Sequence, residues 1–280
     1  MAFKKSIPSV GMLALYAMQF APSVLADVEF CPNDTPLSCS SPSIEPSCCF
    51  NSPGGAFLLT QFWDHDPSIG PSDSWTIHGL WPDNCDGSYE EFCDESREYS
   101  NITAIIEESG RTELLSYMNK YWKDNSGDDE SFWEHEWNKH GTCINTIEPA
   151  CYTDYTAQDE VVDYLQKAVD LFKTLDSYKA LAAAGITPSN SKTYGLSEIH
   201  DALSNIHEGF APYVACDGDY LSEAWYFYYV RGNLITGQYE PSEKLTESNC
   251  PETGIKYAPK SGGNNSTSPP TTACPAPARR

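Results

Sequence analysis

Short apolar runs bounded by turn residues alternate along this chain with longer stretches of helical spacing. Runs rich in aromatic and β-branched residues predict strands at 56–63, 75–82, 211–216 and 224–231. Apolar residues three and four apart predict helices at 111–123, 156–175, 177–184 and 196–207, the last capped by Ser197. The elements follow no regular βαβ repeat. This favours an α+β fold, a single domain with an antiparallel sheet packed against several helices and rich in disulfides.

The two ends of the chain differ from this pattern. Residues 1–26 begin with lysines, continue as an apolar run and end in small residues, which predicts a signal peptide cleaved after Ala26. The alternative, a membrane anchor, is disfavoured because Gln19 and Pro22 interrupt the short run. A Ser/Thr/Pro-rich segment at 258–280 predicts a disordered tail, leaving 27–257 as the catalytic domain.

Charge and cysteine content restrict the function. The formal net charge of −23 disfavours non-specific attraction to polyanions, so any nucleic-acid chemistry needs a local cationic site and is helped by acid pH. Eleven cysteines in an exported chain predict disulfides, with Cys274 as the odd one: free, paired with another molecule, or removed by processing. Acceptor triplets for N-glycans lie at four asparagines: Asn33, Asn101, Asn264 and Asn265.

Candidate chemistry is concentrated in residues 132–143. A helix is expected here from an N-cap at Ser131 to Gly141, which would place Glu136 and His140 on one face, four residues apart. A carboxylate beside an imidazole is expected to raise the pKa of the histidine and to support acid–base catalysis.

The same segment allows interpretations without a catalytic role. It could be an amphipathic helix that exposes one side to solvent and packs two tryptophans on the other. Zinc binding is disfavoured because His135 and His140 are five residues apart, about 140° around a helix. Cys143 could be a nucleophile, but a disulfide is the better prediction in a cysteine-rich chain. Likewise, the aromatic run at 224–231 is predicted as a core strand, not a base-stacking platform.

A third histidine, His78, alternates with apolar residues in the second predicted strand. Such a residue is usually a hydrogen-bonded core histidine, but here a histidine-rich element lies elsewhere in the chain. The segments TIHGLWP at 76–82 and WEHEWNKHGTC at 133–143 resemble the two active-site segments of the ribonuclease T2 family. The resemblance covers roughly 31–250 and also includes residues 61–63 and 197–203. Residues 81–89 are similar to the fungal type.

This resemblance implies a secreted acid endoribonuclease that needs no metal or cofactor. By similarity, His140 is the general base for the 2′-hydroxyl and His78 the general acid for the 5′-oxygen. Glu136 and Lys139 stabilise the pentacoordinate phosphate, Glu136 also orients His140, and His135 binds the phosphate. The products are 2′,3′-cyclic phosphates and then 3′-phosphates, and DNA is no substrate because it lacks the 2′-hydroxyl.

The resemblance also implies base contacts and low base specificity. Trp81, Asp83 and Tyr89 form the main base pocket, where the carboxylate suggests adenine preference. Gln61 and Phe132 contribute to a second base site.

Five disulfides are implied by the family, and spacing alone could not select them. The implied pairs are Cys31–Cys48, Cys39–Cys85, Cys49–Cys151, Cys93–Cys143 and Cys216–Cys250. The expected partner is single-stranded RNA, with no DNA and no membrane, and the expected state is a monomer. The expected location is extracellular, with a vacuole or lysosome as the alternative. Two other functions are carried forward: a secreted glycoprotein that only binds a partner, and a metallopeptidase.

Overall fold

The computed structural model describes residues 28–261. The predicted signal peptide, Asn264, Asn265 and Cys274 lie outside these residues. Packing continues past the predicted start of the tail, because the Trp63 indole donates a 2.8 Å hydrogen bond to the carbonyl of Ala258 and Lys260 is buried.

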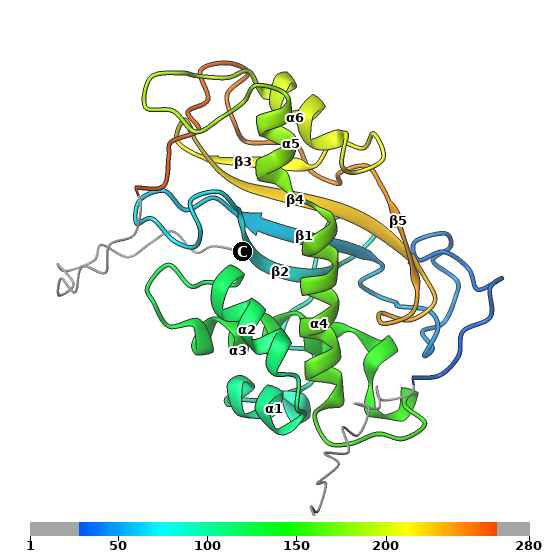
Figure 1. The fold of residues 1–280 in the computed structure, drawn as a ribbon. Coiled ribbons are helices and arrows are strands. Elements are labelled where there is room, and N and C mark those ends of the chain that lie inside the picture. Colours follow the sequence, from blue (N-terminus) through cyan, green and yellow to red (C-terminus); the bar gives the residue numbers. More distant parts are fainter. Residues whose placement is uncertain (1–27, 262–280) are drawn as a thin grey trace, which may run out of the picture.

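An antiparallel five-stranded sheet forms the centre of the fold, with strand order β2-β1-β4-β3 and β5 paired to β4 (Figure 1). The strands are β1 (Ala56–Phe62), β2 (Thr76–Asp83), β3 (Tyr213–Asp217), β4 (Tyr220–Arg231) and β5 (Gln238–Pro241). The α+β class and the four predicted strands are confirmed. The fifth was not predicted, since its four residues alternate between exposed and half-buried positions and carry little apolar signal.

Six α-helices within residues 28–261 flank the sheet. They are α1 (Ile102–Glu108), α2 (Thr112–Tyr121), α3 (Asp129–Lys139), α4 (Asp159–Thr174), α5 (Ser177–Ala183) and α6 (Leu196–Ser204). The long helix α4 runs across the sheet, with α1–α3 beside its first half and α5 and α6 near the other edge of the sheet (Figure 1). Four short 3₁₀ turns complete the set: Glu95–Arg97, Gly141–Cys143, Asn145–Ile147 and Pro149–Cys151. None of the helices within 28–261 is long and apolar enough to cross a bilayer.

Two predicted helix caps are wrong, by three residues in α3 and by two in α6. The Asp128 carboxylate accepts a hydrogen bond from the Ser131 backbone N–H, so Asp128 is the N-cap of α3 and Ser131 lies in its first turn. Helix α6 starts after Gly195, whose N–H donates to the Glu198 carboxylate. In both cases an aspartate or glutamate carboxylate, and not a serine hydroxyl, accepts the hydrogen bond from a backbone N–H at the start of the helix.

Three of the five expected disulfide pairs are confirmed, and two are exchanged. The structure pairs Cys31 with Cys49 and Cys48 with Cys151, at Cα separations of 5.5 and 5.3 Å. Cys48 and Cys49 occupy the middle of a turn that Ser47 and Phe50 close with mutual hydrogen bonds. The turn directs the two neighbouring side chains to different partners, which sequence separation could not reveal.

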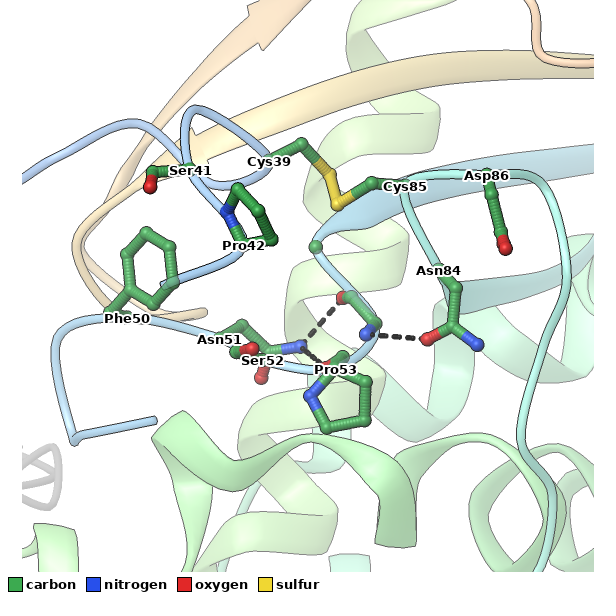
Figure 2. A pocket seen from close by; sticks show the side chains of 12 residues that line it. Cys39, Ser41, Pro42, Phe50, Asn51, Ser52, Pro53, Asn84, Cys85 and Asp86 are labelled. Carbon is green, nitrogen blue, oxygen red and sulfur yellow. Dashed lines mark hydrogen bonds between the residues drawn. A yellow bond between two sulfur atoms is a disulfide. The ribbon is translucent and has the colours of Figure 1, made fainter. Parts of the chain in front are cut away.

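The Cys39–Cys85 bridge lies beside a cavity of about 520 Å³ (Figure 2). Asn51 donates its side-chain amide to the carbonyls of Pro53 and Gly54, and Asn84 accepts from the Gly54 N–H. This cavity contains none of the predicted catalytic residues.

Candidate active site

Strand β2 and helix α3 bring together the side chains that the two motifs predicted. His78 and Trp81 come from β2, while Glu136 lies on α3 and His140 is its C-terminal cap. The Trp81 indole contacts both imidazoles, edge-on to His78 at a centroid distance of 4.7 Å and stacked on His140 at 4.9 Å. The predicted convergence of the two histidines, 62 positions apart in the chain, is thus present around one indole ring.

Buried hydrogen bonds from other elements hold the two halves of the site in place. The Trp122 indole, just after α2, donates to the backbone carbonyl of His78 at 2.9 Å. The Tyr164 hydroxyl of α4 lies 2.9 Å from the Leu80 carbonyl and 3.2 Å from that of Glu136. The Tyr164 hydroxyl therefore links β2 to α3 through the backbone next to the predicted catalytic residues.

Glu136 is fully buried, and its contacts differ from those expected. Its Oε2 accepts a 2.9 Å hydrogen bond from Trp81, and its Oε1 lies 3.6 Å from Nε2 of His78. The partner of Glu136 is therefore His78, and the expectation that it orients His140 is not met. Burial raises the pKa of Glu136, while His78 and the Trp81 hydrogen bond oppose that rise.

The sequence led us to expect a raised pKa for His140, and this is wrong. Burial lowers the pKa of His140 well below its usual value, and Lys139, His78 and His135 add like-charge repulsion. The ring is only 3% exposed, and the carboxylate that was expected to stabilise its charge faces His78 instead. Burial therefore favours the neutral form of His140.

The remaining predicted catalytic residues lie at the mouth of the site. His135 is exposed, 6.4 Å from His140 between ring centroids, and burial of its ring atoms and Lys139 lower its pKa. The Lys139 ammonium is 3.5 Å from the Glu91 carboxylate and 5.9 Å from the Tyr89 ring. Phe92, an exposed aromatic at 48%, stands near His135 and was not singled out from the sequence.

Three of these groups also come close enough to share a ligand. His135, Glu136 and His140 each place one donor atom within 4.8 Å of the others. The i+5 spacing led us to expect rings far apart, but His140 is the cap, with φ −109°, so its ring need not follow the helical spacing. One Glu136 oxygen is engaged by Trp81, and Lys139 lies in the same turn of α3, so the set suits an anionic phosphate better than a cation.

The residues of the two predicted base sites lie as follows. Trp81 and Asp83 lie at the end of β2, and Tyr89, 42% exposed, has its ring 5.9 Å from the Lys139 ammonium. Phe132 lines a second cavity of about 200 Å³ together with His78.

Gln61 is not part of that second cavity. Its amide donates to the Leu175 carbonyl at 3.1 Å and its carbonyl accepts from the Ser177 hydroxyl at 2.7 Å, on the α4–α5 side of the sheet. Its neighbour Phe62 faces the site instead and stacks on His78 at 3.9 Å. Successive strand residues point to opposite faces, so the sequence motif named the right strand but the wrong face.

Comparison with known proteins agrees with this geometry. The family model described as "Ribonuclease T2 family" matches residues 54–250. The chain belongs to the ribonuclease T2 family. Ribonuclease T2 of Aspergillus oryzae is 65% identical over 260 residues, which is 92% of this chain and 94% of that protein. The crystal structure of Actibind, a T2 ribonuclease, is 66% identical and covers 83% of this chain and 99% of its own, with a TM-score of 0.82.

More distant members of the ribonuclease T2 family share the fold. RNase NT, in complex with 5′-AMP, is 26% identical with a TM-score of 0.55, covering 73% of this chain and 98% of its own. Membership confirms the resemblance seen in the two motifs and assigns the chain to the endoribonucleases.

Proposed function

We propose that this T2-family protein cleaves single-stranded RNA by metal-independent transphosphorylation. His140 removes the proton from the 2′-hydroxyl, and the resulting oxygen attacks the adjacent phosphorus. The bond from phosphorus to the 5′-oxygen breaks, and His78 donates a proton to that oxygen. The product is a 2′,3′-cyclic phosphate; attack by water, with the roles of the histidines reversed, gives the 3′-phosphate.

The convergence of His78 and His140 on the Trp81 indole is the observation that carries this proposal. A general base must be unprotonated, and burial with neighbouring cations lowers the pKa of His140 well below its usual value. His78, by contrast, lies 3.6 Å from the Glu136 carboxylate, which can hold the imidazole in place for proton donation. The two imidazoles thus differ in their charged neighbours, although both contact Trp81.

Charge on the phosphorane is stabilised by groups from α3. Lys139 and His135 supply positive charge at the mouth of the site. Glu136, whose pKa burial raises, can hold a proton and donate it to a phosphoryl oxygen at acid pH.

The substrate is RNA with its bases unstacked, because the base sites are aromatic surfaces beside the phosphate position. We assign Trp81, Asp83 and Tyr89 to the main base site, with low specificity and a preference for adenine. Phe62 and Phe132 form the second. DNA is excluded because the attacking 2′-hydroxyl is absent. We further propose a secreted monomer with a cleaved leader and N-glycans on Asn33 and Asn101, both exposed.

Two substrates separate the acid from the base. On an RNA oligonucleotide with EDTA at mildly acid pH, His78→Ala and His140→Ala should each reduce kcat by at least about a thousandfold. On a nucleoside 3′-(p-nitrophenyl phosphate), whose leaving group needs no proton, His78→Ala should recover most of its activity and His140→Ala should not. Recovery of His140→Ala in place of His78→Ala would exchange the two roles. Equal recovery in both variants would contradict the assignment of either role.

The same assay decides against the two other functions. Absence of turnover in the parent protein, with a biological effect that survives His140→Ala, would point to a binding glycoprotein. Inhibition by EDTA with release of bound zinc would point to a metallopeptidase. Neither outcome is compatible with the proposed mechanism.

A further inference from the structure

A second carboxylate, from a distant strand, faces the other nitrogen of His78. Glu223 of β4 places Oε2 at 3.8 Å from Nδ1 of His78, while Glu136 of α3 lies 3.6 Å from Nε2. The imidazole is thus held between two carboxylates from different parts of the fold. Phe62, which pairs with Glu223 across β1 and β4, stacks on the ring and closes its face.

Glu223 is itself fixed in position. The Trp225 indole donates a 2.7 Å hydrogen bond to the same Oε2 atom, two residues further along β4. Trp225 in turn packs edge-on against Trp81 at 5.3 Å. The side chain of Glu223 is 16% exposed, so water screens its charge only partly.

The need for such a carboxylate follows from the surroundings of His78. His78 is 5% exposed, and its Nδ1 atom is buried with no hydrogen-bond partner among the described residues. The charged or titratable groups that face it or share its cavity are Glu136, His135 and His140 from α3 and its cap, Glu223 from β4, and Asp64, Lys123 and Asp124 from the loops. Glu223 is the one that lies beside Nδ1.

We propose that Glu223 is a positioning residue for the general acid. Its carboxylate holds the Nδ1–H of His78, which fixes the orientation of the ring and directs Nε2, with its transferable proton, into the active site. The inference rests on the proposed role of His78. The separation of 3.8 Å is within ion-pair range and longer than a hydrogen bond, so the carboxylate acts on the ring through its charge.

The pH dependence of cleavage tests this role in the full chain. Glu223→Gln keeps the shape and removes the charge, so the alkaline limb of kcat/KM should move to lower pH by about one unit, with KM little changed. Glu223→Asp should restore most of the displacement. Asp217→Asn, a charge loss at the exposed end of β3, is the matched control and should leave the profile in place.

The outcomes separate this inference from the proposed function. A Glu223→Gln profile that coincides with the parent and control would refute the positioning role, while loss of activity in His78→Ala would still stand. If Glu223→Gln does not fold, Trp225→Phe removes the donor to Oε2 together with part of the packing against Trp81, and it should shift the limb in the same direction by less. An unshifted profile there refutes the role as well.

Discussion

The Trp81 indole donates a 2.9 Å hydrogen bond to Oε2 of Glu136 and so connects β2 to α3 at the centre of the active site. Both side chains are almost completely buried. The bond fixes the carboxylate that lies against His78, and it leaves the same indole in contact with both imidazoles. One tryptophan thereby sets the geometry of three catalytic groups.

Replacing this donor should impair catalysis more than stability. Trp81→Phe leaves a buried carboxylate oxygen without its partner, and a hydrogen bond to a charged group contributes about 1.5–3 kcal/mol. We expect kcat/KM to fall roughly 10- to 100-fold. Trp63→Phe, which removes an indole hydrogen bond to the Ala258 carbonyl, is the control: it should lower Tm without lowering kcat.

Gly79 leaves room for the same carboxylate. A Cβ atom at this position would lie 1.9 Å from Oε2 of Glu136. Gly79→Ala must therefore displace Glu136, and we expect a loss of about 1–3 kcal/mol in the free energy of unfolding together with a large loss of kcat. Gly195→Ala, where the nearest atom is a flexible carboxylate at 3.2 Å, should change neither. A fully active Gly79→Ala enzyme would contradict this account.

The Cys93–Cys143 bridge should support catalysis as well as stability. It closes a loop of 50 residues just after His140, and loop-closure entropy gives it about 4 kcal/mol. Replacing both cysteines with serine should lower Tm and also reduce kcat at temperatures where the variant is folded. The Cys216–Cys250 bridge, over 34 residues, should have a similar effect on Tm with kcat unchanged. Equal kcat values in both variants would show that the bridge does not position His140.

Asp163 should make the protein more stable at acid than at neutral pH. Burial raises the pKa of Asp163 to about 6, although Arg111 and Tyr152 oppose this. Because the unfolded chain has a lower pKa, about 3.9, the folded state binds more protons between these values. The contribution of protonated Asp163 to the free energy of unfolding is therefore complete below about pH 4 and is lost as the pH rises through about 6.

Urea unfolding at both ends of this window measures the effect. Asp163→Asn should remove up to about 3 kcal/mol of the difference between acid and neutral pH. Asp201→Asn, an exposed carboxylate on α6, is the control and should leave the difference intact. A parent enzyme whose stability does not fall across this range would contradict the prediction.

The sequence by itself determined the fold class, four strands, most of the helices and the two motifs that carry the catalytic side chains. Apolar periodicity is a local property of each segment, and a long motif specifies its residues wherever it folds. Short elements, such as β5 and α1, were not predicted because so few residues give little apolar periodicity. Gln61 and Phe62 show the limit: the motif located the strand, but only its pairing with β2 and β4 decided which neighbour faces His78.

Tertiary structure alone decided the partners and the protonation of the active-site groups. Glu136 and His140 are four apart on the helix, yet the carboxylate faces His78, because β2 lies against that side of α3. The low pKa of His140 comes from its burial, which no local pattern of residues specifies. Glu223 joins the site only through the sheet, from a strand some 145 positions beyond His78.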